Sequence, residues 1–225
     1  MSPPPSTLLN RRAATARILR DRGNALVVTG LGNPSFDVAA AGDTPLNFYL
    51  WGAMGGAAMV GLGLALAQSE RRVLVFMGDG EMMMGLGSLA TISVEKPDNL
   101  AIIVLDNEHY AETGMQPSHT GRGVDLAGIA LAAGFADAVT IRTEQELESL
   151  APKLLAARGP LFMAIKVATD PTPTALPPRD GPYLRSRFRE ALLGADAHGW
   201  RGSSRPAEQH MSTGLMPRQL SPLHQ

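Results

Sequence analysis

The amino-acid sequence predicts an α/β fold, a doubly wound, mainly parallel sheet with helices on both faces. One observation is that short apolar runs, such as LAIIVL at residues 100–105, alternate with segments of helical character between residues 25 and 167. Another is that glycines or polar residues follow directly on these runs, as in Gly78-Asp79-Gly80 and Asp106-Asn107. The 225 residues have room for one good-sized domain of this kind with extensions.

The first part of this pattern is a helix, a strand, a turn and a second helix. Residues 7–22 fit a helix, and ALVVT at residues 25–29 fits a buried strand. The turn GLGNP at residues 30–34 lacks the third glycine of a dinucleotide-binding fingerprint, which favours a plain strand-to-helix turn. The glycine-rich run after Met54 forms the next helix. In the first helix we expect four basic side chains to be largely solvated, namely Arg11, Arg12, Arg17 and Arg20.

The central part of the chain alternates strands with helices. Residues 72–77 and 100–105 are apolar and rich in strand-forming residues, and residues 81–96 between them fit a helix. A capping box, Thr143-Glu144-Gln145-Glu146, marks the start of a later helix. The remaining expected elements are a helix at 125–134, a strand at 138–141, a helix at 143–158 and a strand at 161–167.

The composition divides the chain into three parts. Residues 1–24 form an N-terminal arm and helix, and residues 25–170 form the α/β domain. Residues 171–225 are rich in proline and contain one short basic helix at 183–193. The arginines of that helix form either a solvated face or a clamp on a partner subunit. From residue 195 onward the apolar content is low, and we expect the tail to be disordered.

Global features exclude several function classes. The formal net charge of −1 gives no broad basic surface for nucleic acid. The chain has no cysteine, which rules out disulfides and zinc-thiolate sites and slightly favours the cytoplasm. The N-terminus lacks the apolar core of a signal peptide. Residues 48–67 are uncharged over about the length of a membrane-spanning helix, but their many glycines favour a helix packed tightly on a sheet. We therefore expect no membrane span.

Polar residues stand at the ends of the two central strands. Gly78, Asp79 and Gly80 follow one strand, and Asn107 follows the next. Both loops open at the carboxyl edge of a parallel sheet, so Asp79 and Asn107 can converge on one point that suits a hard cation with oxygen ligands. The flanking glycines allow close backbone approach, and the start of the next helix favours phosphate. The ligand predicted here is a magnesium-bound diphosphate.

This spacing resembles the diphosphate motif of thiamine-diphosphate-dependent enzymes, a Gly-Asp-Gly followed some 25 residues later by Asn. The resemblance implies that the side chains of Asp79 and Asn107 and the backbone carbonyl of His109 bind Mg²⁺. Upstream, Gly52-Ala53-Met54 resembles the segment that receives the aminopyrimidine ring and bends the cofactor. The implied cofactor-binding residues are Gly52, Met54, Gly78, Asp79, Gly80, Glu81, Met82 and Asn107.

Enzymes of this superfamily need a second, pyrimidine-binding domain, which supplies the glutamate that activates the cofactor. The chain has no room for both domains, so the resemblance implies a hetero-oligomer with a pyrimidine-domain alpha subunit. Residues 48–51 and Met54 approach the expected cleft, and some of them should form an apolar patch that the partner covers.

Within the superfamily, Tyr110 three residues after Asn107 and the helix around residues 87–92 resemble 2-oxo acid decarboxylases of the sulfopyruvate and phosphonopyruvate type. The resemblance implies a small anionic 2-oxo acid as substrate, with Tyr110 and His119 as candidate catalytic residues and Arg122 as a candidate anion contact. Glu81 directly after Gly80 is instead familiar from transketolases, so a split transketolase is an alternative. A non-catalytic cofactor-binding subunit is a third interpretation.

Overall fold

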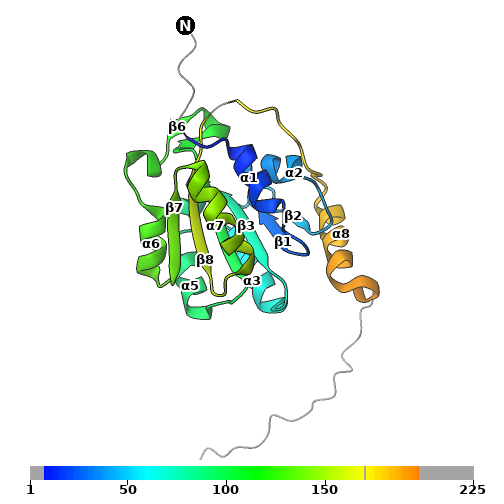
Figure 1. Cartoon of the computed structure of the whole chain (residues 1–225). Coiled ribbons are helices and arrows are strands. Elements are labelled where there is room, and N and C mark those ends of the chain that lie inside the picture. The colour runs from blue at the N-terminus through cyan, green and yellow to red at the C-terminus, as the bar shows by residue number, and fades with distance from the viewer. Residues whose placement is uncertain (1–7, 170, 198–225) are drawn as a thin grey trace, which may run out of the picture.

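A six-stranded, all-parallel sheet forms the centre of the molecule (Figure 1). The computed structural model describes residues 8–169 and 171–197. The order of strands in the sheet is β2-β1-β3-β4-β8-β7. The strands are β1 (Leu26–Thr29), β2 (Asn47–Tyr49), β3 (Val73–Gly78), β4 (Leu100–Asp106), β7 (Asp137–Ile141) and β8 (Leu161–Lys166). β3 and β4 are almost entirely buried, because helices cover both of their faces.

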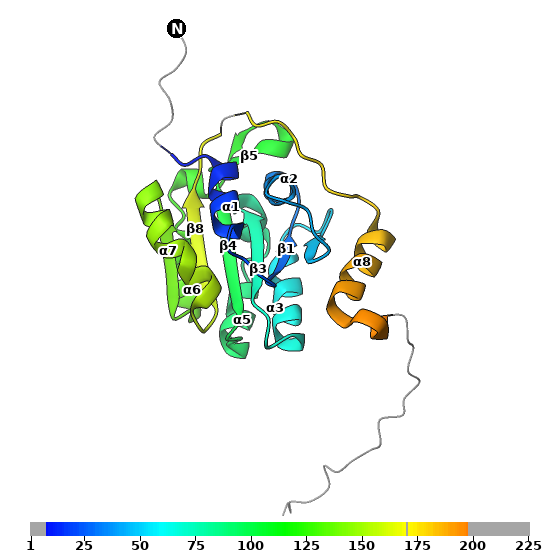
Figure 2. The same ribbon diagram turned by 45° about the vertical axis from the view of Figure 1, so that its right-hand side comes forward.

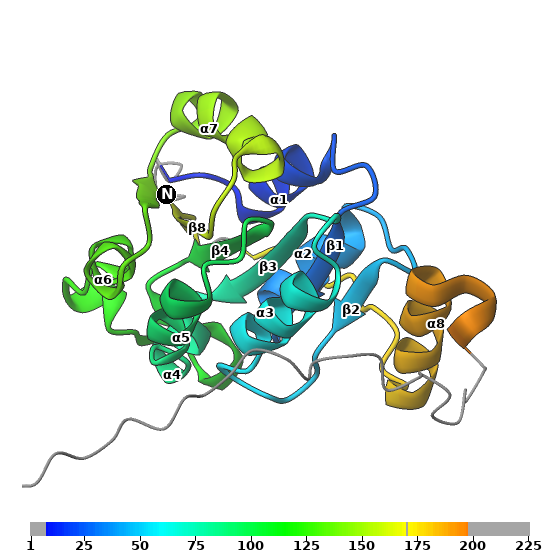
Figure 3. The same cartoon turned by 90° about the horizontal axis from the view of Figure 1, so that it is seen from below.

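Helices pack on both faces of the sheet, which confirms the predicted doubly wound fold (Figures 2 and 3). One face carries α1 (Arg11–Leu19), α2 (Asn33–Ala40) and α7 (Glu144–Ala156). The other carries α3 (Ala57–Ala67), α4 (Asp79–Met84), α5 (Ser88–Glu95) and α6 (Leu126–Ala133). Each face encloses its own hydrophobic core. The predicted capping box is present at the start of α7, where Thr143 and Glu146 bond each other's backbone amides.

The order of the strands places a ligand-binding edge between β1 and β3. From β1 the chain passes outward to β2, then returns to β3 on the other side of β1. At such a switch point the loops after the two neighbouring strands diverge and leave a crevice at the carboxyl edge. The loop after β1 leads into α2, with Pro34 in its first turn, so the expected strand-to-helix turn is confirmed.

The single helix expected at residues 81–96 is wrong, because it is divided into α4 and α5. Residues 85–87 separate the two helices as a turn. At Gly85 an added Cβ would lie 2.4 Å from the carbonyl oxygen of Gly55. The chain breaks the helix where its backbone touches the backbone of the segment before α3. α4 also begins two residues earlier than expected, so Asp79 and Gly80 are helical rather than part of a loop.

Several short elements were not predicted. They are β2, the antiparallel pair β5 (His109–Tyr110) and β6 (Gln116–Pro117), and the 3-10 helices η1 (Ala111–Thr113) and η2 (Thr120–Arg122). Each is too short to leave a periodic pattern in the sequence. The first helix is shorter than expected, and Thr7, where it was placed to begin, lies outside the described residues.

The expectation that the arginines of the first helix are largely solvated is wrong for three of the four. Arg11 is buried, and its Nη1 donates to Asp37 Oδ2 at 2.5 Å. Arg12 Nε donates to the other oxygen of Asp37, and Arg17 pairs with Glu148 on α7. These ion pairs join α1 to α2 and α7. Burial, the largest effect, raises the pKa of Asp37, and the two arginines oppose that rise.

The C-terminal segment crosses the top of the molecule to α8 (Gly181–Leu193), which packs beside the edge strand β2 (Figure 1). Phe188 stacks against Phe48 with ring centroids 5.4 Å apart, and Arg187 pairs with Asp43. The basic helix therefore contacts its own chain through Arg187. Residues 194–197 form the 3-10 helix η3, contrary to the disorder expected from residue 195, and the rest of that tail lies outside the described residues.

The C-terminal segment covers part of the apolar patch that was expected at residues 48–51 as the contact surface for a partner. Tyr49 is buried in the core, and Phe48 is covered by α8. Trp51 donates from Nε1 to the carbonyl oxygen of Pro178, and the guanidinium of Arg179 lies 5.2 Å from its ring centroid. Of the expected patch, Met54 is the one large side chain in the described chain with more than a third of its surface exposed. Within the described residues no helix combines the length and apolar character needed to cross a membrane.

Candidate cofactor site

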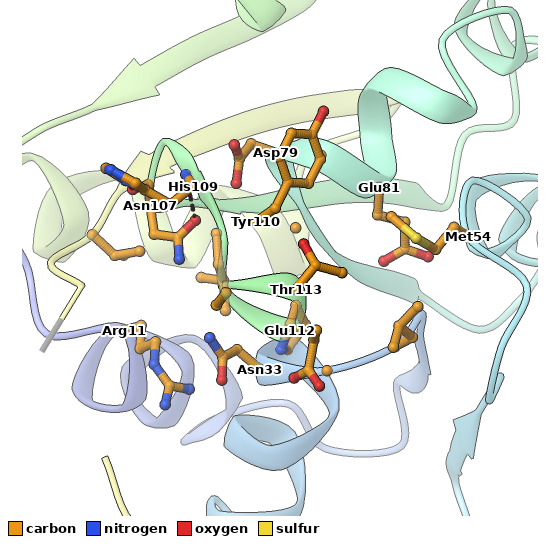
Figure 4. Close-up of a pocket in the computed structure, with 18 residues that line it drawn as sticks. Arg11, Asn33, Met54, Asp79, Glu81, Asn107, His109, Tyr110, Glu112 and Thr113 are labelled. Atoms are coloured by element: carbon orange, nitrogen blue, oxygen red, sulfur yellow. Dashed lines mark hydrogen bonds between the residues drawn. The ribbon is translucent and has the colours of Figure 1, made fainter. Parts of the chain in front are cut away.

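A pocket lies at the carboxyl edge of the sheet, at the switch point between β1 and β3 (Figure 4). It brings together the loop after β1, the start of α4, the end of β4 and the hairpin that follows it. Its lining residues are Arg11, Leu31, Gly32, Asn33, Pro34, Met54, Gly78, Asp79, Gly80, Glu81, Leu105, Asn107, His109, Tyr110, Ala111, Glu112, Thr113 and Val167. Six of the eight predicted cofactor-binding residues are among them.

Asp79 lies at the first position of α4, where the amides of the helix start favour negative charge. Its side chain is almost completely buried. Ser118 and Thr120 contact its Oδ2 through their hydroxyl groups. Burial is the main cause that raises the pKa of Asp79, and nearby Asp106 raises it further, while the hydrogen bonds from Ser118 and Thr120 lower it. A carboxylate held in this way is suited to binding a cation.

Asn107 faces the same end of the pocket from the end of β4 (Figure 4). Its side-chain oxygen accepts a hydrogen bond from the amide of His109 at 3.1 Å, and the ring Nδ1 of His109 lies 2.9 Å from the backbone carbonyl of Asn107. These contacts fix the turn between β4 and β5. An amide oxygen has two lone pairs, so Asn107 can still offer one to a cation.

Tyr110 closes the pocket above Gly80. A Cβ added to Gly80 would lie 2.3 Å from the ring of Tyr110, so only glycine allows this close approach. The phenol Oη of Tyr110 lies 3.3 Å from Nδ1 of His119. His119 itself is exposed and outside the set of pocket-lining residues, and so is Arg122. The structure therefore places Tyr110 in the pocket, with His119 behind it, and the catalytic roles of both residues stay predictions.

Glu81 is an unusual pocket residue because its carboxylate is buried with little compensation. The residue is 4% exposed, and neither carboxylate oxygen makes a hydrogen bond of normal geometry. Burial raises the pKa of Glu81 to about 7, although the amides of Gly78, Leu31 and Gly55 are close enough to oppose the rise. A Cβ on Gly30 would overlap the Glu81 carboxylate, so glycine at the end of β1 creates the space for this side chain.

Met54 lies next to Glu81 at the opposite end of the pocket from Asn107 (Figure 4). The thioether side chain is 37% exposed at the mouth. Gly55, directly after it, has a positive φ of 82° and packs its backbone against Gly85. Gly52 has a φ of 86° and is not among the pocket-lining residues, and the side chain of Met82 lies in the core beneath α4. Side-chain contact with a ligand is therefore excluded for Met82, and a contact through the backbone stays a prediction for both.

Sequence reasoning missed part of the site. The loop Leu31–Pro34 and the residues Glu112 and Thr113 all line the pocket. The switch point in the strand order could have indicated the loop Leu31–Pro34, because the ends of β1 and β3 lie side by side there. No sequence signal places Arg11 in the pocket, because it belongs to a helix that precedes the first strand of the sheet. Its guanidinium is already paired with Asp37.

Comparisons with known proteins assign this architecture to a family. A model of the C-terminal cofactor-binding domain of thiamine pyrophosphate enzymes matches residues 30–165. Sulfopyruvate decarboxylase subunit beta of Methanothermobacter thermautotrophicus is 37% identical over 188 residues, which are 84% of this chain and 98% of that protein. Phosphonopyruvate decarboxylase of Streptomyces viridochromogenes is 37% identical over 158 residues, 70% of this chain and 39% of that protein.

Other relatives are longer single chains. The sulfopyruvate decarboxylase of Methanosarcina acetivorans is 34% identical over 182 residues, 81% of this chain but 47% of its own length. Among solved structures, the thiamine-diphosphate-dependent 4-hydroxybenzoylformate decarboxylase of Rhodococcus jostii RHA1 superposes with a TM-score of 0.62 at 18% identity, over 76% of this chain and 35% of that one. The fold, the pocket and the family match agree. This chain belongs to the thiamine pyrophosphate enzymes and contains their C-terminal cofactor-binding domain.

Proposed function

We propose that this chain is the diphosphate-binding beta subunit of a two-subunit, thiamine-diphosphate-dependent 2-oxo acid decarboxylase of the sulfopyruvate or phosphonopyruvate type. The observation that carries the proposal is the alignment with a protein named as a beta subunit, which spans 98% of that protein at 37% identity. The pocket agrees with it, since an acidic residue and an amide converge at one end and an exposed methionine stands at the other.

The donor set fits Mg²⁺ together with a diphosphate. Among the described residues, no three His, Cys, Asp or Glu side chains gather into a complete metal site. Mg²⁺ is commonly bound by only one or two carboxylates, with phosphate oxygens and waters completing an octahedron. Asp79 and Asn107 would supply side-chain oxygens, and His109 its backbone carbonyl. The amides of Gly80 and Glu81, near the start of α4, would receive the diphosphate.

The cofactor, when bound, would supply a carbanion as the nucleophile and its positively charged thiazolium ring as the electron sink for decarboxylation. The residues of this chain hold it and shape its surroundings. Met54 would support the bent form of the cofactor at the mouth of the pocket. Tyr110, whose Oη lies 3.3 Å from Nδ1 of His119, would transfer a proton to or from the substrate. The activating glutamate would come from the partner.

The second anionic group of the substrate has no evident receptor within the described part of this pocket. Arg11 is the pocket's only arginine or lysine among the described residues, and Asp37 neutralises it. His109 is the other candidate, but its ring is turned toward the carbonyl of Asn107. We infer that the partner subunit supplies the charge that recognises a sulfonate or phosphonate, and that the assembled enzyme acts in the cytoplasm.

The surface that the partner covers is inferred from exposed apolar residues beside the pocket mouth. α3 contains no charged residue, and α5 packs next to it (Figure 3). Large side chains on these two helices and at the end of α4 are exposed, and we call them the α3–α5 face. Its members are Met59, Leu66, Met84 and Val94. The contact between Gly55 and Gly85 makes this face continuous with Met54, so one partner surface can cover both.

The function is tested by co-expression with a pyrimidine-domain alpha subunit. The purified complex should release CO₂ from sulfopyruvate or phosphonopyruvate in the presence of thiamine diphosphate and Mg²⁺. A transketolase would instead transfer a two-carbon ketol unit between sugar phosphates without CO₂. If the verified complex were inactive in both assays, the non-catalytic interpretation would replace the proposal.

A further inference from the structure

We propose that the hydroxyls of Ser118 and Thr120 are positioning groups that hold Asp79 as a one-oxygen ligand for the metal. This inference rests on the proposed function, since it takes Asp79 to be the metal-binding carboxylate. It concerns two residues that no sequence motif indicated. Both are almost completely buried, although they belong to a segment that is otherwise largely exposed.

Both hydroxyls contact the same oxygen of Asp79. Ser118 Oγ donates to Oδ2, and Thr120 Oγ1 lies 3.1 Å from that atom. Oδ1 is therefore the oxygen left to face a cation. A carboxylate with one oxygen fixed by the protein cannot rotate to bind a cation through both oxygens.

The two hydroxyls have different roles because each can donate only one hydrogen bond. Each hydroxyl has one proton to donate. Ser118 gives its proton to Asp79, and Thr120 has its shortest acceptor, at 2.7 Å, in Oδ1 of Asp106. Ser118 Oγ and Thr120 Oγ1 are also 2.9 Å apart. Thr120 therefore lies between two buried acidic side chains, Asp79 and Asp106, and can give its single proton to only one of them at a time.

A buried cation anchors the far end of this chain of contacts. Lys166, at the end of β8, places its Nζ 2.7 Å from Oδ2 of Asp106 and 2.7 Å from Oε1 of Glu108. Asp106 thus has one oxygen bound to Lys166 and the other bound to Thr120 and to the amide of Glu108. The rigid central strands β4 and β8 thereby fix the position of Thr120.

The hairpin β5–β6 delivers the hydroxyls to this place. His109 pairs with Pro117, and the amide of Ser118 donates to the carbonyl of Glu108 at 2.8 Å. The segment that follows the metal-binding end of β4 therefore folds back on the strand end. As a result, the backbone of the hairpin joins the turn that Asn107 fixes to the hydroxyls that contact Asp79.

A fixed oxygen should favour a small cation with strict geometry. Mg²⁺ needs a near-ideal octahedron at 2.0–2.1 Å, whereas Ca²⁺ accepts flexible, often bidentate carboxylates at longer distances. Loss of either hydroxyl would allow Asp79 to rotate. We therefore expect weaker Mg²⁺ binding and a smaller preference for Mg²⁺ over Ca²⁺, and a merely structural role would not change that preference.

The test uses the complex of this chain with its partner subunit, saturated with thiamine diphosphate, and Mn²⁺ as a paramagnetic probe that Mg²⁺ or Ca²⁺ displaces. Ser118→Ala and Thr120→Val should weaken Mg²⁺ binding by about 10- to 100-fold, the usual cost of losing a group that orients a ligand. The ratio of Mg²⁺ to Ca²⁺ affinity should fall as well. Thr120→Ser, which keeps the hydroxyl, should restore both values to within about threefold of the original chain.

Thr15→Val is the matched control, because Thr15 is buried and its hydroxyl donates to the carbonyl of Arg11 on its own helix, away from Asp79. It should lower thermal stability without changing the cation ratio. If Mn²⁺ binds and Asp79→Ala abolishes binding, but Ser118→Ala and Thr120→Val leave both the affinity and the ratio unchanged, the positioning role is wrong. If the original complex binds no Mn²⁺ with thiamine diphosphate, or the complex with Asp79→Ala binds it equally well, the proposed function itself fails.

Discussion

Asp79 and Asn107 are the residues on which the proposed metal site depends. Asp79→Ala or Asn107→Ala should reduce magnesium-dependent binding of thiamine diphosphate by at least about 100-fold, because each variant removes an oxygen ligand rather than a group behind one. Calorimetry on the complex with the partner measures this. Asp98→Ala, which removes an exposed carboxylate paired with Arg158, is the control and should bind normally. Undiminished affinity in both site variants would exclude the assignment.

Glu81 should make the stability of the metal-free, cofactor-free chain depend on pH. Its folded-state pKa of about 7 is above the ordinary value of 4.5, so between these values the folded chain binds more protons than the unfolded chain. Stability is therefore fully present below pH 4.5 and decreases as pH rises to about 7. The loss is on the order of 3 to 4 kcal/mol, since each pKa unit corresponds to about 1.4 kcal/mol.

The measurement is urea unfolding from pH 5 to pH 8 with a chelator present. Glu81→Gln should flatten the decline and be more stable than the original chain at pH 8, because it removes a buried charge without a hydrogen-bond partner. Glu112→Gln removes an exposed carboxylate from the same pocket and controls for net charge. An equally steep decline in Glu81→Gln would show that other groups cause it.

Among the secondary-structure elements, the break between α4 and α5 is a place where two backbone segments touch and an added side chain would push them apart. Gly85→Ala would place a Cβ 2.4 Å from the carbonyl oxygen of Gly55, which neither backbone can relieve without moving. We expect a loss of about 1 to 3 kcal/mol in unfolding free energy, typical of overpacking. We also expect weaker cofactor binding, because Met54 would be displaced with Gly55.

Gly87→Ala is the matched control in the same turn. An added Cβ there meets no atom within 4 Å, and the residue has helical dihedral angles, so the variant should be neutral or slightly more stable. Chemical denaturation measures the unfolding free energy of Gly85→Ala and Gly87→Ala, and cofactor titration measures their affinity for thiamine diphosphate. Equal behaviour of both would mean that the contact between Gly55 and Gly85 has no energetic importance.

The success of the sequence prediction also differs from element to element. The buried strands β3, β4 and β8 were placed to within about a residue, because a strand covered on both faces leaves a continuous apolar run. The division of the helix after β3 could not be predicted, since its cause is a backbone contact with a glycine 30 positions earlier. The convergence of Ser118 and Thr120 on Asp79 could not be predicted either, because these residues are also distant from Asp79 in the sequence. It depends on a two-residue strand pair that leaves no periodic signal.

At the scale of the whole molecule, the pocket lies beside the exposed apolar side chains of the α3–α5 face. Val94 and Met84 are 77% and 66% exposed, and α3 adds Met59 and Leu66. Exposed apolar patches of this kind on a soluble domain usually mark an interface. The lone chain should therefore self-associate and bind thiamine diphosphate weakly, and it should have no decarboxylase activity until the partner is present.

Charge placed on the α3–α5 face tests whether the partner binds there. Leu66→Glu and Val94→Glu should weaken the complex by at least about tenfold, because an unpaired charge would be buried at its centre. Both side chains are solvent-exposed in the lone chain, so these variants should fold normally and scatter less light than the original chain. Leu131→Glu, on the exposed side of α6, is the control and should assemble normally. Full assembly and CO₂ release by Leu66→Glu and Val94→Glu would place the partner on another surface, and full activity of the lone chain would require an activating carboxylate within this sequence.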